Sequence, residues 1–415
     1  MSTRAVARPR HDPVPLAVIA GLFVASLALR PQLLAIGPLQ PLIRSDLALS
    51  ATLGGLLTTI PVLCMGLFAP LGPRFAARLG PRRAFAVCIG LIAGFGLVRG
   101  LLPAYPLILL ATFGIGVAIG TAGAIPSMIV SRRIPGRPAL GTGAYAGGIV
   151  AGSTIGAGLA VPLALDGDWR LSLIALSAAS LVAAMAWLVL VPGEGDGPPL
   201  PSRALRLPWS SLTGWLLVLV FGLQSILFYG IVAWLPSAIG EQGWSVSDAG
   251  SLIAVFNGVG LATTIGVPLV ADRLGARRPQ LILSSAVAVV TMIGIILAPT
   301  FAFPLIAVMG LALGMVFPLV LTLPLDVADD ASQVGSVAAL MLLGGYILSS
   351  IGPFVLGIAR DVTGSFTTSL WILVAVAVAL VACCLLLSPT RLREGIRRAA
   401  PAATPDPAAT PDPAG

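Results

Sequence analysis

One arginine lies where an arginine is costly. Arg30 stands midway along an apolar run, Pro15–Pro41, with no carboxylate within one helical turn on either side. A cation at the centre of a bilayer costs about 2.5–3.5 kcal/mol on insertion scales, so this side chain must face protein or water. Its planar guanidinium suits bidentate binding of a small anion. The alternative is a structural arginine that bonds helix-end carbonyls or Gln32, and Pro31 fits both because it frees carbonyls nearby.

The composition indicates that most of the chain lies in a membrane. Of its 415 residues, 57% are hydrophobic and only 10% are charged, whereas a soluble protein carries roughly 25% charge. A membrane-crossing helix needs roughly 20 apolar residues. Twelve runs meet this need, at about Pro15–Pro41, Leu53–Leu71, Ala84–Leu102, Pro106–Val130, Leu140–Leu165, Leu171–Val191, Leu212–Ile239, Ala249–Val270, Leu281–Leu297, Phe303–Leu325, Gly335–Ile358 and Phe366–Leu387.

The placement of the arginines predicts which side of the membrane each loop faces. The 24 basic residues are all arginine, and the net charge is +8. With both termini cytoplasmic, nineteen arginines fall in cytoplasmic segments, and Arg44, Arg99, Arg170 and Arg360 fall on the outer side. This bias follows the positive-inside rule. The charge therefore does not indicate nucleic-acid binding, and we expect a multi-pass protein of a bacterial inner membrane.

A short basic turn occurs twice in the chain. PRFAARLGPRR (Pro73–Arg83) and PLVADRLGARR (Pro268–Arg278) lie 195 residues apart and share seven of eleven residues. The chain is thus predicted to be a duplicated six-helix half, as in transporters built from parallel repeats. Further residues match at the same offset: Pro41 with Pro236, Ser50 with Ser245, and Gly55 with Gly250.

The offset of 195 residues also predicts what faces Arg30. It carries Arg30 onto Ser225, so Gln224 and Ser225 are expected across the pseudo-twofold axis, with Tyr229 one turn further on the same face. We interpret these four residues as a polar, substrate-binding cluster at the midplane; helix–helix hydrogen bonding is the alternative for Gln224. Three secondary candidates, for which packing is the alternative, are Asn257, Tyr145 and Tyr346.

The basic turn resembles the signature of the major facilitator superfamily, approximately G-x-L-x-D-R-x-G-R-R. This resemblance implies an all-α membrane fold of twelve helices in two six-helix bundles. It also implies a cytoplasmic lock on helix movement, formed by the aspartate and arginines of the turn; a role in topology alone is the alternative. The second copy fits with Asp272, Arg273, Gly275, Arg277 and Arg278, and the first with Arg78, Gly80, Arg82 and Arg83. Ala77 replaces the first aspartate, so we expect an asymmetric lock, charged only at Asp272.

Two segments narrow the resemblance. LRPQLLAIGPLQPLI (Leu29–Ile43) and GLQSILFYGIVAWLP (Gly222–Pro236) are similar to helices one and seven of the cyanate and 2-nitroimidazole transporter branch. Phe317-Pro318, Leu325-Asp326 and Arg99 also fit it. The resemblance implies a secondary transporter of a small, cyanate-like anion or a small polar organic solute, working by alternating access.

Energy coupling has one candidate residue. Asp326 is the only carboxylate near the core of an apolar run, so it is the candidate for proton coupling. The alternatives are an anionic solute that itself travels with a proton, and uniport or exchange without coupling. Gly148, Gly152 and Gly156 resemble the antiporter motif of drug exporters, with Ala157 in place of its proline. Proton-coupled drug or metabolite efflux is the alternative function, and a membrane sensor without transport is a second one. No nucleotide-binding loop, metal-ligand cluster or nucleophile pattern occurs, so we expect neither an enzyme nor a cofactor.

These observations divide the chain into five parts. We expect a cytoplasmic tail at 1–14, six-helix bundles at 15–191 and 212–388, and a cytoplasmic linker at 192–211. The end of the chain, 389–415, repeats AATPDP and is predicted to be a disordered cytoplasmic tail. The expected partners are the lipid bilayer, the solute and, in a coupled cycle, protons; we expect a monomer.

Overall fold

The computed structural model describes residues 16–134, 137–193, 207–270, 277–327 and 331–387. This part of the chain is helical, and no strand occurs in it. Eleven of its helical segments are long and apolar enough to cross a membrane, and α9 (Pro138–Ala160) fills the remaining predicted span. The predicted all-α membrane fold is therefore confirmed.

The two halves of the chain form two helical bundles. In the first, α6 packs against α7 and α10, and in the second α11 packs against α15 and α16. The first bundle contains α1 (Leu16–Leu27), α2 (Pro31–Leu34), α3 (Ile36–Asp46), α4 (Ala51–Phe68), α5 (Leu71–Leu79), α6 (Pro81–Leu101), α7 (Tyr105–Ala122), α8 (Ile125–Arg133), α9, η1 (Leu165–Gly167) and α10 (Trp169–Leu190). The second contains α11 (Leu212–Gly240), α12 (Val246–Val270), α13 (Arg277–Leu297), η2 (Pro299–Phe301), α14 (Ala302–Val327), α15 (Ala331–Thr363) and α16 (Phe366–Leu386).

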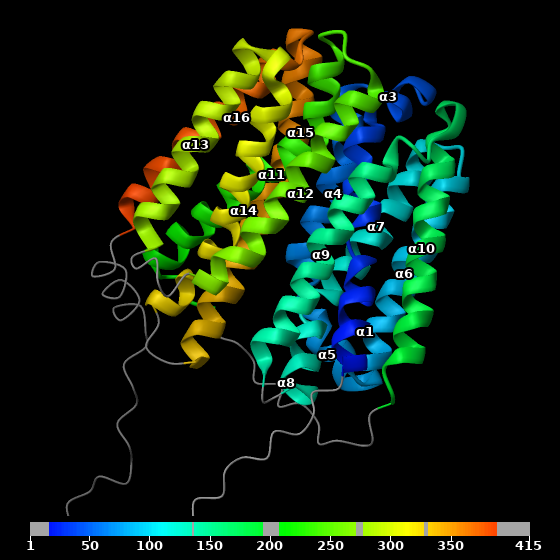
Figure 1. Ribbon diagram of the computed structural model, residues 1–415, viewed down its shortest axis with the longest axis vertical. Coiled ribbons are helices and arrows are strands. Elements are labelled where there is room, and N and C mark those ends of the chain that lie inside the picture. Colours follow the sequence, from blue (N-terminus) through cyan, green and yellow to red (C-terminus); the bar gives the residue numbers. More distant parts are fainter. Residues whose placement is uncertain (1–15, 135–136, 194–206, 271–276, 328–330, 388–415) are drawn as a thin grey trace, which may run out of the picture.

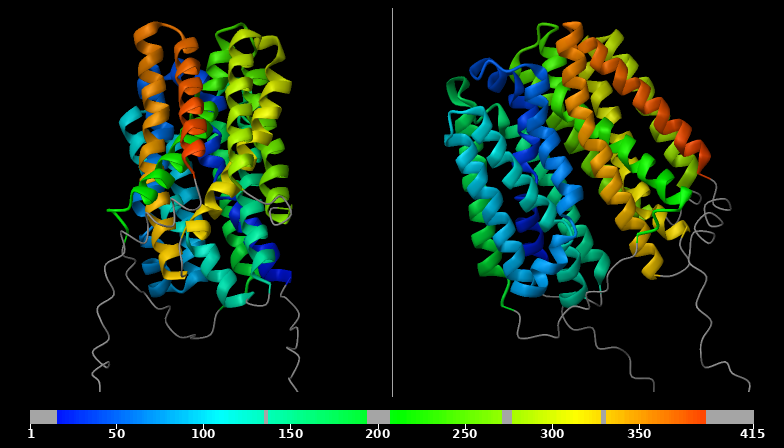
Figure 2. Two further views of the ribbon diagram at one scale, coloured as in Figure 1. Left: turned by 90° about the vertical axis from the view of Figure 1, so that its left-hand side faces the viewer. Right: turned by 180° about the vertical axis from the view of Figure 1, so that it is seen from behind.

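The bundles meet at one end of the molecule and spread apart towards the other (Figure 1). They meet near α3 and are far apart near α5 and α8, as the two turned views also show (Figure 2). We call these the α3 end and the α8 end. Across the boundary between the halves, α4 packs on α15, α9 on α12, and α3 on α11.

The first predicted span is a broken helix. It is divided into α1, α2 and α3 by interruptions at residues 28–30 and at Ala35. Pro31 accounts for the first interruption, because it has no N–H to donate to the carbonyl of Leu27. Arg30 lies at this interruption as the N-cap residue of α2, and its carbonyl accepts hydrogen bonds from the N–H groups of Leu33 and Leu34, each at 3.0 Å.

The glycines of α9 make room for this broken helix. A Cβ atom added to Gly152 would lie 2.1 Å from the carbonyl oxygen of Leu27, and one added to Gly156 would lie 2.5 Å from the Cα of Pro31. Gly148, one turn earlier, is similarly crowded. Only glycine therefore lets α9 lie this close to α1 and α2.

Equivalent residues make equivalent contacts in the two halves. Ser50 caps the first turn of α4, and Ser245, 195 residues later, caps that of α12. Asp46 and Glu241 are separated by the same offset, and each binds the start of the last helix of its half. Asp46 accepts from the side chain of Arg170 at 2.6 Å, and Glu241 accepts from the first N–H of α16 at 3.0 Å. These contacts support the predicted duplication in three dimensions.

We predict that Gly152→Ala destabilises the protein, because the new methyl group must displace the backbone of α1. Overpacking of this kind costs about 1–3 kcal/mol. Gly143→Ala on the same helix is the matched control, since no atom lies within 4 Å of a Cβ placed there. Thermal unfolding of the detergent-solubilised variants measures the difference. Equal melting temperatures for the two variants would show that the close packing of α9 is dispensable.

Candidate functional site

A cavity lies between the two bundles at the level of the interruption in the first span. It encloses about 680 Å³ of space, part of it open to solvent. Most of its lining comes from α11, α12 and α14, whereas the first half contributes Arg30 and one face of α9. The lining residues are Arg30, Ile149, Val150, Ser153, Gln224, Ser225, Phe228, Tyr229, Phe256, Asn257, Gly260, Thr264, Gly310, Leu313, Gly314, Phe317 and Tyr346.

Arg30 connects the two halves within this cavity. Its Nη1 donates to the hydroxyl of Tyr229 at 2.7 Å and contacts the sulfur of Met65 at 3.7 Å. The Tyr346 hydroxyl also lies near the guanidinium. Among the described residues, no ion pair joins Arg30 to a carboxylate. A guanidinium has five N–H donors, so these contacts leave positive charge and donors for a ligand.

Aromatic rings form the wall beside the guanidinium. The rings of Phe228 and Phe256 lie 5.6 Å apart with an angle of 37° between their planes. Behind the cavity, the buried Phe221 packs against Phe317 at 6.4 Å and against Tyr346 at 5.1 Å. These contacts fix the rings, so the cavity offers flat apolar surfaces next to one cation. Such a surface suits a small solute with a flat body and a polar or anionic end.

Neutral polar groups complete the lining. Gln224 Oε1 accepts from Ser225 Oγ at 3.3 Å, and Asn257 Nδ2 donates to the carbonyl of Ile253 at 2.9 Å. These bonds engage one end of each amide and leave Gln224 Nε2 and Asn257 Oδ1 for other partners. The cavity thus combines one guanidinium with uncharged donors and acceptors.

The structure brings together six of the seven predicted substrate-binding residues: Arg30, Gln224, Ser225, Tyr229, Asn257 and Tyr346 all line the cavity. Tyr145 does not line it. It lies on α9 one turn before Ile149, towards the α8 end, and packs half-buried against the apolar core. The sequence identified Tyr145 by residue type alone, without a symmetry partner to place it.

The first basic turn connects α5 to the start of α6. Gly80 joins α5 to α6 with a φ of +77°, in the left-handed region that favours glycine. Arg78 occupies the last turn of α5. Arg82 donates to the carbonyls of Leu188 and Val191 at the end of α10, whose last carbonyls lack helical partners.

The second basic turn is only partly described. Asp272, Arg273 and Gly275 lie outside the described residues. Arg278 donates to the carbonyl of Leu385 at 2.6 Å, so each turn binds the end of the last helix of its half. Arg277 forms an ion pair with Asp326 at the end of α14. The carboxylate predicted for proton coupling therefore lies outside the cavity lining and has a cationic partner.

Several cavity residues escape prediction from a single sequence. The lining residues Phe228, Phe256 and Phe317, and Met65 beside Arg30, stand in apolar runs, where aromatic and aliphatic residues also face lipid. Two of them carried a usable signal, because Phe228 precedes Tyr229 and Phe256 precedes Asn257. A ring beside a predicted polar residue is a reasonable candidate for the same wall.

The halves are hydrogen-bonded to each other at the α3 end. Asp361, near the end of α15, accepts from the N–H of Ala51 at 2.8 Å and the N–H of Thr52 at 2.7 Å. It also accepts from the Thr52 hydroxyl at 2.6 Å. A carboxylate of the second half thus binds the first turn of α4, where free N–H groups favour an anion.

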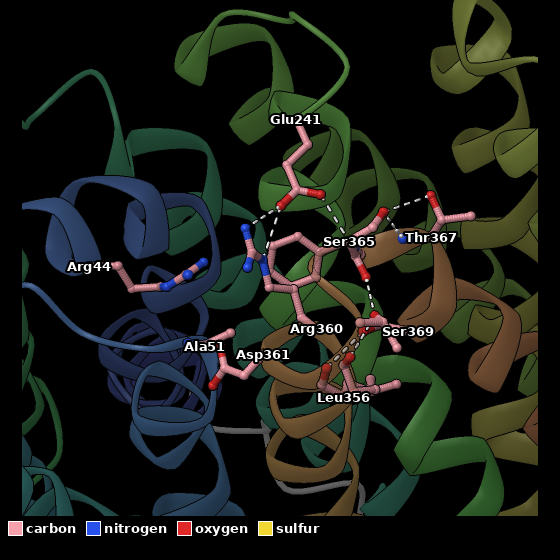
Figure 3. A network of polar contacts seen from close by, with 12 residues as sticks. Arg44, Ala51, Glu241, Leu356, Arg360, Asp361, Ser365, Thr367 and Ser369 are labelled. Carbon is pink, nitrogen blue, oxygen red and sulfur yellow. Dashed lines mark hydrogen bonds and ion pairs between the residues drawn. The ribbon is translucent and has the colours of Figure 1, made fainter.

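Neighbouring charges surround this contact (Figure 3). Arg44 of the first half lies 5.8 Å from the ring centres of both Trp234 and Phe366 in the second half. Arg360 pairs with Glu241 at 3.0 Å. The boundary at the α3 end therefore carries hydrogen bonds and cation–π contacts, while the bundles diverge towards the α8 end (Figure 1).

Comparison with known proteins places these features in a family. The model of the Major Facilitator Superfamily matches residues 16–353. The chain is 30% identical to the 2-nitroimidazole transporter of Escherichia coli (strain K12), over 85% of this chain and 90% of that protein. It is also 30% identical to the cyanate transport protein CynX of the same organism, over 83% and 90%.

Solved structures show the same fold. A bacterial homolog of the human lysosomal transporter Spinster, in an inward-facing and occupied conformation, superposes with a TM-score of 0.73 at 17% identity. That match covers 92% of this chain and 98% of the other. The D-xylose-proton symporter superposes with a TM-score of 0.70 at 15% identity, over 92% and 98% of the chains.

Proposed function

We propose, because the chain belongs to the major facilitator superfamily, that its cavity carries a small solute across the bacterial inner membrane by alternating access. The solute is a small, cyanate-like anion or a small polar organic compound. We place the α8 end at the cytoplasm, because Arg74, Arg132 and Arg278 lie towards it, as the positive-inside rule requires.

The observation that carries this proposal is Arg30 in the cavity with no carboxylate partner among the described residues. A charge left without a counter-ion inside a membrane protein is expensive, and it marks a functional site by default. An anionic solute supplies the missing counter-charge. Tyr229 then serves to hold the guanidinium in place while the solute is absent.

The aromatic wall supports the same class of solute. Cyanate and 2-nitroimidazole, the compounds named for two relatives at 30% identity, are both small and rich in acceptor atoms. Cyanate is a linear anion, and 2-nitroimidazole is a flat ring. A guanidinium beside the rings of Phe228 and Phe256 offers donors to the acceptors and an apolar face to the rest of the molecule. Gln224 and Asn257 add neutral hydrogen-bonding groups at the edge.

Alternating access is supported by the difference between the two ends. In the arrangement described, hydrogen bonds join the halves at the α3 end, and the bundles diverge at the α8 end (Figure 1). The opposite state requires the Asp361 contact to break. This contact is therefore proposed as the outer closure of the cycle.

Proton-coupled drug or metabolite efflux is the less favoured alternative. It needs a titratable carboxylate in contact with the solute path, and none lines the cavity in the described part of the chain. Asp326 is paired with Arg277 instead. We therefore favour uniport or exchange of the solute over a cycle in which a cavity carboxylate carries the proton.

We predict that Arg30→Ala lowers transport by about ten- to hundredfold, because hydrogen bonds to a charged group contribute about 1.5–3 kcal/mol. Counterflow of labelled cyanate and, separately, of 2-nitroimidazole in proteoliposomes measures this in either direction of transport. Arg74→Ala, at an exposed arginine of α5, is the matched control and should transport normally. Wild-type protein that moves neither compound refutes the solute class; normal transport by Arg30→Ala refutes the site.

We predict that Asp361→Asn opens the α3 end more often. A charge at an exposed helix terminus contributes up to about 1 kcal/mol, or about fivefold in population. The measurement is the labelling rate of Ser153→Cys, in a background without native cysteines, by an impermeant thiol reagent in right-side-out vesicles. Asp46→Asn is the matched control, since Asp46 bonds only within its own half. Equal labelling in both variants would rule out the outer closure.

A further inference from the structure

A second arginine is buried in the first bundle, away from the cavity lining. Arg99 lies near the end of α6 and has no exposed surface. Its Nη2 donates to the backbone carbonyl of Gln32 at 2.6 Å and to Gln32 Oε1 at 2.7 Å. Its Nε and Nη1 have no hydrogen-bond partner among the described residues. This cation therefore directs its hydrogen bonds at a single residue.

Gln32 also forms hydrogen bonds to a third helix, α10. Its Nε2 donates to the carbonyl of Leu173 at 2.9 Å and to Ser177 Oγ at 2.8 Å, both on α10. Gly96 makes the junction possible, because a Cβ there would lie 2.6 Å from Ser177 Oγ and 2.7 Å from Gln32 Cδ. A chain of hydrogen bonds thus joins α6, α2 and α10 behind the broken span.

The short α2 helix has little structure of its own to set its orientation. It holds four residues, Pro31–Leu34, between the interruptions at residues 28–30 and at Ala35. Arg30 is its N-cap residue, and Gln32 lies two positions further along. Two positions along a helix point to nearly opposite sides. Arg30 accordingly lines the cavity while Gln32 points into the first bundle.

We propose that Arg99 is a positioning residue for Arg30. Arg99 donates hydrogen bonds to both the backbone carbonyl and the side chain of Gln32, and these bonds fix the rotation of α2 about its own axis. This rotation determines that the Arg30 guanidinium points into the cavity. The consequence for solute binding rests on the proposed function. The positioning itself does not, because it concerns only where residue 30 lies.

Arg99 is buried and has no counter-ion within the described part of the chain, which favours this role over plain stabilisation. An uncompensated buried charge destabilises a fold, so removing the Arg99 guanidinium offsets the loss of its two hydrogen bonds to the oxygens of Gln32. Arg99→Met should therefore yield a protein that melts no lower than wild type. A purely structural arginine would instead show loss of folded protein in parallel with loss of activity.

The first measurement tests positioning without any solute. In a cysteine-free background, Arg30→Cys is labelled with a thiol reagent, with and without Arg99→Met. We expect the labelling rate to change at least fivefold, while Ser153→Cys, which lies on α9 in the first-half lining of the cavity, is labelled at the same rate in both. An unchanged rate at position 30, in protein that melts as wild type does, overturns the proposal.

The second measurement tests the consequence. In cyanate counterflow, Arg99→Met is expected to raise the half-saturating concentration about tenfold with a smaller change in maximal rate. Arg99→Lys should restore part of the loss. In an Arg30→Lys background, Arg99→Met should add little, because residues that act through one another are not additive. An equal loss in both backgrounds overturns the proposal.

Two serines on α10 provide a matched pair of controls. Ser177→Ala removes one of the two acceptors of Gln32 Nε2 and should reproduce a weaker form of the Arg99→Met effect. Ser180 is buried on the same helix but donates only to the carbonyl of Leu176 in its own helix. Ser180→Ala should leave cyanate saturation unchanged. If wild type and Arg30→Ala behave alike in counterflow, the proposed function fails, and the labelling result alone then decides the role of Arg99.

Discussion

A backbone group that leaves its helix inside a membrane must find another partner within the protein. The first span of this chain leaves its helix at Arg30, where a solute-binding role is proposed. Several helices of the first bundle pack against this interruption and hold its backbone in place. The glycines of α9 allow a close approach to Leu27 and Pro31, and the opposite side is held through Gln32. The site therefore depends on a defect in one helix that its neighbours are shaped to accommodate.

How much was predictable depended on whether a residue had a sequence partner. The offset of the repeat predicted that Ser225 is the equivalent of Arg30, and helical spacing predicted that Tyr229 lies on the same face as Ser225. In the structure, the Tyr229 hydroxyl lies 2.7 Å from Arg30 Nη1. The number of spans followed from hydropathy, and the two-bundle arrangement followed from the repeat and from the resemblance to the superfamily. The contact between Arg99 and Gln32 was not predicted, because the two residues are 67 positions apart and no local sequence pattern links them. Arg99 was noted only as a residue that fits the cyanate and 2-nitroimidazole transporter branch. The aromatic wall could not be predicted for a different reason. In a membrane helix, the sequence pattern around a phenylalanine that faces the cavity is the same as around one that faces lipid.

The two halves share a scaffold but not a site. Ser50 and Ser245 cap equivalent helices, Asp46 and Glu241 tie equivalent helix starts, and Arg82 and Arg278 bind equivalent helix ends. The cavity, in contrast, takes its cation from the first half and most of its aromatic and amide groups from the second. Duplication thus explains how the bundles are built, and divergence between the copies explains what lies between them.

The Asp361 contact has an evolutionary consequence. Two of its three donors are peptide N–H groups of Ala51 and Thr52, which every residue except proline supplies. Substitutions on the α4 side therefore leave most of the contact intact, whereas almost any substitution of Asp361 removes it. The two sides of this contact are therefore constrained differently: the residues at positions 51 and 52 can vary in sequence, and Asp361 cannot. Paired changes, the usual trace of contacting side chains in related sequences, are not expected to reveal it.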